Sequence, residues 1–321
     1  MNIAKSKTIR SVEVCEGLLL RGLDGTNPLG FLAALGIFRV LDEACGSGVL
    51  RMSWASSDGT WAPVLHPSSG PTLEEDAVLT SLTQRLVKTI EDHPANLLSK
   101  LESASDDGQA RRRFIQDIAA GTDRDRMDWT SALASDFAPP DSINQLQTTR
   151  RDYFFGNLSS VISRTNREHL RRAVFHPWDY SDALDNQSLH LDPSEDRRHA
   201  HQWNKPAGDP DRKTRGGMLG ANRLALEAIP LFPSFPEANT LRTVGFTGTR
   251  STNTRWTWPL WSVRLSLPIV RSFLGSRVLQ RDPLGDADIA LLKAQGVVAV
   301  YRTRRILVGK TPNFTPAQCI G

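Results

Sequence analysis

Hydrophobic positions along residues 28–45 recur every three or four residues, which is the spacing of one face of an α-helix. The apolar positions of this segment are Leu29, Leu32, Ala33, Gly36, Ile37, Val40, Leu41 and Ala44. Asn27 suits the N-cap, Pro28 suits the first helical position, and Gly46 suits the C-terminal end. We therefore expect a helix here that turns one apolar stripe toward the core.

Shorter apolar runs predict strands and hairpins on either side of further helical segments. Strands are expected at 12–21, 50–54, 60–65, 241–248, 255–261 and 297–309, the last as two strands or one bent strand. Two or three helices are expected within 73–120, and others near 164–172, 222–229, 266–274 and 286–295. The predicted fold class is α+β, with an N-terminal strand–helix–hairpin unit and a basic, hairpin-containing C-terminal half. The polar span 122–149 suggests a boundary between subdomains 1–145 and 146–321, although one domain also fits.

Composition narrows the class of protein. The 321 residues are 39% hydrophobic and 23% charged, as in soluble globular proteins. No apolar run reaches the roughly 18 residues that span a bilayer, and no secretion signal is evident. Cys15, Cys45 and Cys319 are isolated thiols without a metal-binding or disulfide spacing. We expect a soluble, cytoplasmic protein that needs no cofactor and has no membrane partner.

Charge is distributed unevenly. Residues 238–280 contain no Asp or Glu but contain Arg242, Arg250, Arg255, Arg264, Arg271 and Arg277. After Asp288 the chain again lacks carboxylates and carries Lys293, Arg302, Arg304, Arg305 and Lys310. Because cationic contacts to phosphates supply most sequence-independent affinity for nucleic acid, this asymmetry favours a nucleic-acid partner.

The polar stretch 191–223 is the main candidate for that contact. Its Gly- and Pro-rich middle would lay cationic side chains against phosphates and end at a helix N-terminus. Trp203, Trp256 and Trp258 lie among arginines and could stack on bases, although tryptophans in strands more often belong to the core. The predicted nucleic-acid-binding residues are Arg197, Arg198, Lys205, Arg212, Lys213, Arg215, Asn222, Arg223, Arg250, Arg255 and Trp256.

A metal-dependent nuclease is the alternative. Six potential ligands lie close together: His190, Asp192, Glu195, Asp196, His199 and His201. Their spacing matches no established metal motif, and Arg197 and Arg198 would repel a cation. Local pairing of these charges is the simpler interpretation, so no catalytic residue and no metal ligand is assigned.

Four blocks of sequence together resemble a CRISPR-associated family of type I-G loci, formerly type I-U. They are LLRGLDGTNPLGFLAALGIFRVL, DPSEDRRHAHQW, GGMLGANRLALEAIPLFP and RWTWPLW. Members of that family are similar to short relatives of the large subunit of the surveillance complex, or Cascade.

The resemblance implies a non-catalytic, antiviral-defence subunit that binds target DNA at the flanking motif or the displaced strand. Its implied partners are guide RNA, target DNA, the backbone and guide-processing subunits, and a separate helicase-nuclease. A scaffold that contacts only protein, through the 28–36 helix face and the 256–261 strand, is a third hypothesis.

Overall fold

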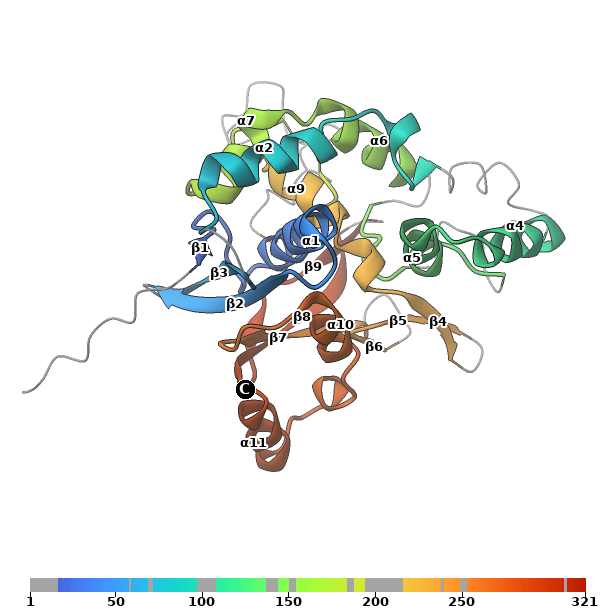
Figure 1. The fold of residues 1–321 in the computed structure, drawn as a ribbon. Helices are drawn as coiled ribbons and strands as arrows, with labels where there is room; N and C mark the ends of the chain where they lie inside the picture. Colours follow the sequence, from blue (N-terminus) through green and yellow to red (C-terminus); the bar gives the residue numbers. More distant parts are fainter. Residues whose placement is uncertain are drawn as a thin grey trace, which may run out of the picture.

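The fold is α+β, as predicted, with helices packed around and between antiparallel sheets (Figure 1). The computed structural model describes residues 17–57, 59–68, 72–96, 108–136, 144–149, 154–183, 188–193, 216–237, 240–248, 253–308 and 311–321. Within these ranges, no helix is both long enough and apolar enough to cross a membrane.

Helix α1 (Pro28–Cys45) lies at the centre of the molecule (Figure 1). The predicted cap is confirmed: the Asn27 side chain accepts hydrogen bonds from the backbone amides of Leu29 and Gly30, and Gly46 ends the helix at a φ of 100°. The expectation of a single buried stripe is wrong, because every residue from Pro28 to Asp42 is buried. Neighbouring elements cover this helix on all sides.

The cap residue also ties α1 to a distant segment. Asn27 Nδ2 donates a hydrogen bond of 2.8 Å to the carboxylate of Asp192, which is fully buried. Asn27 therefore caps the first turn of α1 and also links that turn to the segment around Asp192.

Asn27→Ala is expected to lower the free energy of unfolding by about 1–2 kcal/mol, because both the cap and a partner of a buried carboxylate are lost. Asn27→Ser keeps a capping oxygen, so its loss should be smaller. Urea denaturation of both variants checks this order, and equal losses would contradict the role of the cap.

The N-terminal sheet has the order β1-β3-β2 and is antiparallel. Its strands are β1 (Leu18–Leu19), β2 (Leu50–Ser57) and β3 (Thr60–Pro67). The predicted hairpin is confirmed and tighter than expected, since Ser57 pairs with Thr60. Residues 12–16 of the first predicted strand lie outside the described residues.

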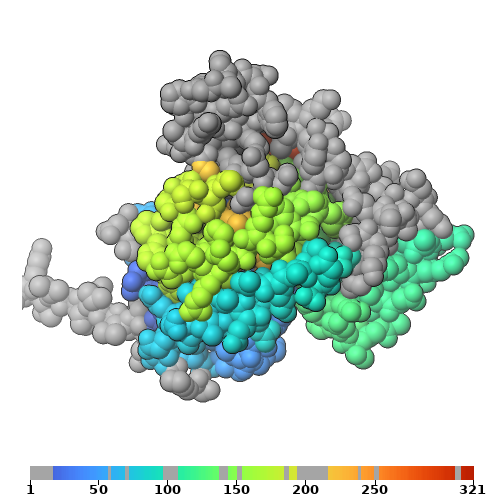
Figure 2. Space-filling model, turned by 90° about the horizontal axis from the view of Figure 1, so that it is seen from above, coloured from blue at the N-terminus to red at the C-terminus, as the bar shows by residue number. Residues whose placement is uncertain are grey.

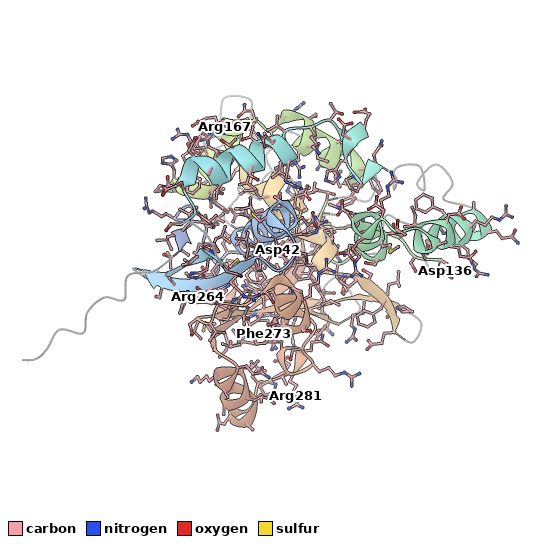
Figure 3. The ribbon with its side chains drawn as sticks, in the orientation of Figure 1. Asp42, Asp136, Arg167, Arg264, Phe273 and Arg281 are labelled. Carbon is pink, nitrogen blue, oxygen red and sulfur yellow. The ribbon has the colours of Figure 1, made fainter. Side chains whose placement is uncertain are left out.

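Helices cover α1 on one side. They are α2 (Glu75–Leu86), α6 (Phe154–Arg164), α7 (Arg167–Phe175) and α9 (Leu219–Leu226), with the short turns η1 (Ile90–Asp92) and η5 (Ile229–Leu231). Figure 2 shows α2 beside α6 and α7 on this face. Arg167 of α7 pairs with Asp76 of α2 at 2.5 Å (Figure 3). Helices α4 (Gly108–Ala120) and α5 (Arg124–Leu133) lie to one side (Figure 1), and α5 falls in the polar span where no element was predicted.

The C-terminal part is built on a second antiparallel sheet of order β10-β8-β7-β6, with β9 on β8. Its strands are β6 (Phe246–Thr247), β7 (Arg255–Trp261), β8 (Val297–Val308), β9 (Thr311–Phe314) and β10 (Gln318–Cys319). A separate hairpin pairs β4 (Ser234–Glu237) with β5 (Thr240–Thr243). Between β7 and β8 lie α10 (Leu267–Leu274), η6 (Val278–Gln280) and α11 (Asp286–Ala294). The last two predicted helices are thus confirmed.

One hydrophobic core joins the two halves of the chain. Phe31 of α1 lies between Trp54 of β2 and Trp258 of β7, with ring centroids 5.7 and 5.5 Å away. The same core continues through α9 and β6. The predicted boundary near residue 145 therefore does not divide the hydrophobic core.

A buried ionic cluster lies beside this core. Glu227, at the end of α9, accepts hydrogen bonds from Arg39 of α1 at 3.1 Å, His93 at 2.9 Å and Arg223 at 2.5 Å. Arg39 also pairs with Asp125 of α5 and, at 3.2 Å, with Glu43. Burial alone would raise the pKa of Glu227, but the charges of Arg223, His93 and Arg39 outweigh it and hold that pKa far below its ordinary range. Glu227 therefore joins α9 to α1 and to His93, and Arg39 extends the cluster to α5.

Candidate nucleic-acid interface

Strands β7 and β8 place their arginines on one face of the C-terminal sheet. Arg255 lies directly opposite Arg304, and Thr257 lies opposite Arg302. Residues directly opposite in an antiparallel pair share a face, and side chains two apart on a strand do the same. The pattern Arg-x-Thr on β7 and Arg-x-Arg on β8 thus gathers three guanidinium groups on the face away from the tryptophans.

Like charges directly opposite one another destabilise a sheet, so this face needs an anion. Asp282, in the loop after η6, supplies one: its Oδ1 accepts a hydrogen bond of 2.7 Å from Arg302, and its Oδ2 pairs with Arg255. Burial and the nearby charge of Arg255 lower the pKa of the Arg302 guanidinium. One carboxylate therefore compensates two of the three cations.

Arg304 is the most accessible of the three. It is exposed, and its guanidinium forms no hydrogen bond or ion pair with any residue that the structure describes. It borders an open pocket of about 440 Å³ whose other lining includes Arg255, Asp282 and Arg302. Thr315 and Gln318 add polar groups, and Pro316, Ala317 and Ile320 form an apolar wall. The pocket offers cations, hydrogen-bonding groups and an apolar surface within reach of a phosphate-bearing ligand.

Other arginines of the C-terminal third are paired with carboxylates, which lie both nearby and far away in the sequence. Arg242 pairs with Glu237, Arg271 with Asp128 of α5, and Arg281 with Asp288. Arg264 and Arg281 lie at separate places in the lower half of the molecule (Figure 3). The carboxylate-free run in the sequence is therefore not a carboxylate-free surface, and the cations without a partner are fewer than the sequence suggests.

Most of the predicted contact residues lie outside the described residues. These are Arg197, Arg198, Lys205, Arg212, Lys213, Arg215 and Arg250, together with Trp203. Of the predicted set, Arg255 is the residue that the structure brings into the pocket.

Three predicted contacts are wrong because their side chains are fully buried: Asn222, Arg223 and Trp256. Asn222 accepts a hydrogen bond from the amide of Leu189 at 2.8 Å, and Arg223 pairs with Glu227 inside the core. Trp256 stacks on Phe246 with ring centroids 5.7 Å apart. The strand alternation that turns Arg255 outward turns Trp256 inward.

The N-terminus of α9, which was expected to offer its amides to phosphate, is already occupied. The amide of Leu219 donates a hydrogen bond of 2.8 Å to Asp182, and Asp182 also pairs with Arg172 of α7 at 2.8 Å. A carboxylate of the chain therefore takes the place at the helix N-terminus that a phosphate would take.

Only part of the alternative metal site lies within the described residues. Asp192 accepts hydrogen bonds from Asn27 at 2.8 Å and from the hydroxyl of Tyr180 at 3.0 Å, which suits a structural carboxylate. Glu195, Asp196, His199 and His201 lie outside the described residues. Within the described ranges, no group of three or more His, Cys, Asp or Glu side chains could hold a metal ion.

Sequence reasoning did not assign Arg302, Arg304 or Asp282 to the site. The alternation in RWTW and in YRTRR was a usable signal, because it predicts one charged face on each strand. The pairing of these two strands, whose partners Arg255 and Arg304 are 49 residues apart, and the position of Asp282 between them could not be read from local pattern.

Neither a scan against protein-family models nor a search of curated proteins finds a match to this chain. The arrangement of residues in the fold therefore carries the functional argument.

Proposed function

We propose that this protein binds nucleic acid through the pocket formed by Arg255, Arg302 and Arg304. The observation that carries the proposal is the facing pair Arg255 and Arg304, with Arg302 beside them, on one side of the β7–β8 ladder. Guanidinium groups bind phosphate oxygens with two parallel hydrogen bonds, and an exposed cluster of them is a typical contact for a phosphodiester backbone.

The resemblance to the type I-G family gives this binding a biological setting. In that setting the chain is a non-catalytic, cytoplasmic subunit of an RNA-guided surveillance complex that binds target DNA, and a separate helicase-nuclease cuts. Neighbouring genes for backbone, guide-processing and helicase-nuclease proteins would support this setting, and their absence would argue against it.

The competing scaffold hypothesis loses both of its proposed contact surfaces. The helix face at 28–36 and the strand at 256–261 are buried inside the chain itself. They are not available to another subunit in this structure, so a nucleic-acid role remains the better account of the exposed arginines.

Arg304→Ala is expected to weaken binding of single-stranded and duplex DNA by a similar factor, because a phosphate contact carries no sequence information. The slope of log K against log salt concentration should become shallower by about 0.7 to 0.9, the value for one phosphate contact. Fluorescence anisotropy with labelled oligonucleotides at several salt concentrations measures both quantities.

Arg113→Ala is the matched control, since Arg113 is also exposed but lies on α4, away from the C-terminal sheet (Figure 1). Its affinity and salt slope should stay at the wild-type values. The proposal fails if wild-type protein binds no oligonucleotide at low salt, or if both variants lose affinity equally.

A further inference from the structure

Asp282 occupies the position that a phosphate group would need. Its two carboxylate oxygens face two guanidinium groups, those of Arg302 and Arg255. A phosphate group also presents several anionic oxygens, so it could bridge the same two guanidinium groups. The chain thus places its own anion at the centre of the basic pocket.

Arg302 does not depend on Asp282 for its position. Its Nε donates a hydrogen bond of 2.9 Å to the hydroxyl of Thr257, and its Nη2 donates one of 2.6 Å to the carbonyl of Arg281. These neutral partners would keep the guanidinium in place after the carboxylate had left. The side chain of Asp282 is 43% exposed, so it can move into solvent without opening the core.

The pocket has room for the exchange. The pocket has a volume of about 440 Å³, and Asp282 is one of its lining residues. Arg304 lines the same pocket, and its guanidinium has no partner among the described residues. A phosphate group bound at Arg304 would share the pocket with the negative charge of Asp282, which also holds Arg255 and Arg302. Two anions that compete for the same guanidinium groups repel each other, so one of them must leave.

We propose that Asp282 is an internal competitor, whose carboxylate an incoming phosphate group displaces from Arg255 and Arg302. This exchange rests on the proposed function for the source of the phosphate, which is the nucleic-acid backbone. It lowers the affinity of the pocket, because the energy of the internal ion pairs is subtracted from that of the phosphate contacts to Arg255 and Arg302.

Asp282→Asn tests the exchange, because it removes the charge and keeps the shape. The variant should bind a labelled single-stranded oligonucleotide about tenfold more tightly than wild type, the factor that corresponds to about 1.4 kcal/mol. The concentration of inorganic phosphate that half-saturates the protein should fall by a similar factor. Asp76→Asn is the matched control for net charge, since Asp76 is 87% exposed on α2 and pairs with Arg167; its affinities should change less than twofold.

A measurement on the unaltered protein covers the case in which Asp282→Asn fails to fold. Titration with inorganic phosphate should shift the Nε–H NMR signal of Arg255 and leave that of Arg271, which pairs with Asp128, unchanged. An unmoved Arg255 signal up to saturating phosphate would overturn the exchange.

The outcomes separate the two proposals. If neither form binds oligonucleotide but phosphate affinity rises in Asp282→Asn, the exchange stands and the nucleic-acid proposal fails. If wild type and Asp282→Asn bind the oligonucleotide equally tightly, and also bind inorganic phosphate equally tightly, nucleic-acid binding stands and the exchange is wrong.

Discussion

Glu227→Gln is expected to lower the free energy of unfolding by about 3–5 kcal/mol, which is the usual cost of removing one partner from a buried ion pair. Arg39 and Arg223 are 1% and 0% exposed, and both donate to this carboxylate. Glutamine keeps the size of the side chain but takes the carboxylate away from Arg223 and leaves Arg39 with Asp125 and Glu43. Chemical denaturation of wild type and variant measures the difference.

The same carboxylate makes stability depend on pH in a defined direction. Because its folded pKa is far below that of the unfolded chain, Glu227 stabilises the fold fully above the unfolded value of about 4.3, and this contribution is lost as the pH falls below it. Burial raises the pKa of Glu43 and of Asp125, and the charge of Glu227 raises both further. These two groups therefore act against the effect of Glu227, but the shift of Glu227 itself is the larger one. The gap in stability between wild type and Glu227→Gln should therefore narrow below about pH 4.

Glu237→Gln is the matched control. Glu237 pairs with Arg242 on the β4–β5 hairpin, and its side chain is 47% exposed. Exposed ion pairs contribute about 0–1 kcal/mol, so this variant should unfold close to wild type. A loss at Glu227 no larger than the loss at Glu237 would refute the structural role of the buried cluster.

The elements that the sequence predicted well are those whose signals are local. Asn27, Pro28 and Gly46 mark the two ends of α1, and each acts within a few residues of its own position. Ser266 and Gly296 similarly lie at the ends of segments whose helices, α10 and α11, were predicted. Helix α5 was missed because its apolar residues are few, and its burial comes from packing against η5.

The site could not be predicted in the same way, because charge in a folded chain depends on partners distant in sequence. Arg271 is paired with Asp128, which precedes it by 143 residues. A count of arginines along the chain treats such residues as free. Arg255 and Trp256 were both predicted contacts, but adjacent residues of a strand point to opposite faces. Arg255 therefore lines the pocket, whereas Trp256 lies in the core.

Gly36→Ala is expected to be strongly destabilising, although alanine is normally the better helix former by about 1 kcal/mol. Gly36 lies where α1 crosses α9, and a Cβ atom added there would stand 1.8 Å from the carbonyl oxygen of Leu224 and 3.3 Å from the amide nitrogen of Ala228. The first distance is well below van der Waals contact, and both partners are backbone atoms that no side-chain rotation can move. The two central helices must separate, and overpacking of this kind costs about 1–3 kcal/mol or more.

Gly156→Ala provides a control in which the same substitution should have the opposite sign. Gly156 is exposed on α6, and no atom lies within 4 Å of an added Cβ. Only helix propensity acts there, so the variant should be more stable than wild type by up to about 1 kcal/mol. Thermal unfolding of both variants gives the comparison: a stabilised Gly36→Ala would mean that α1 and α9 do not pack as closely as the structure places them. If both expectations hold, the close approach of these helices is what holds Arg39 of α1 within reach of Glu227 at the end of α9.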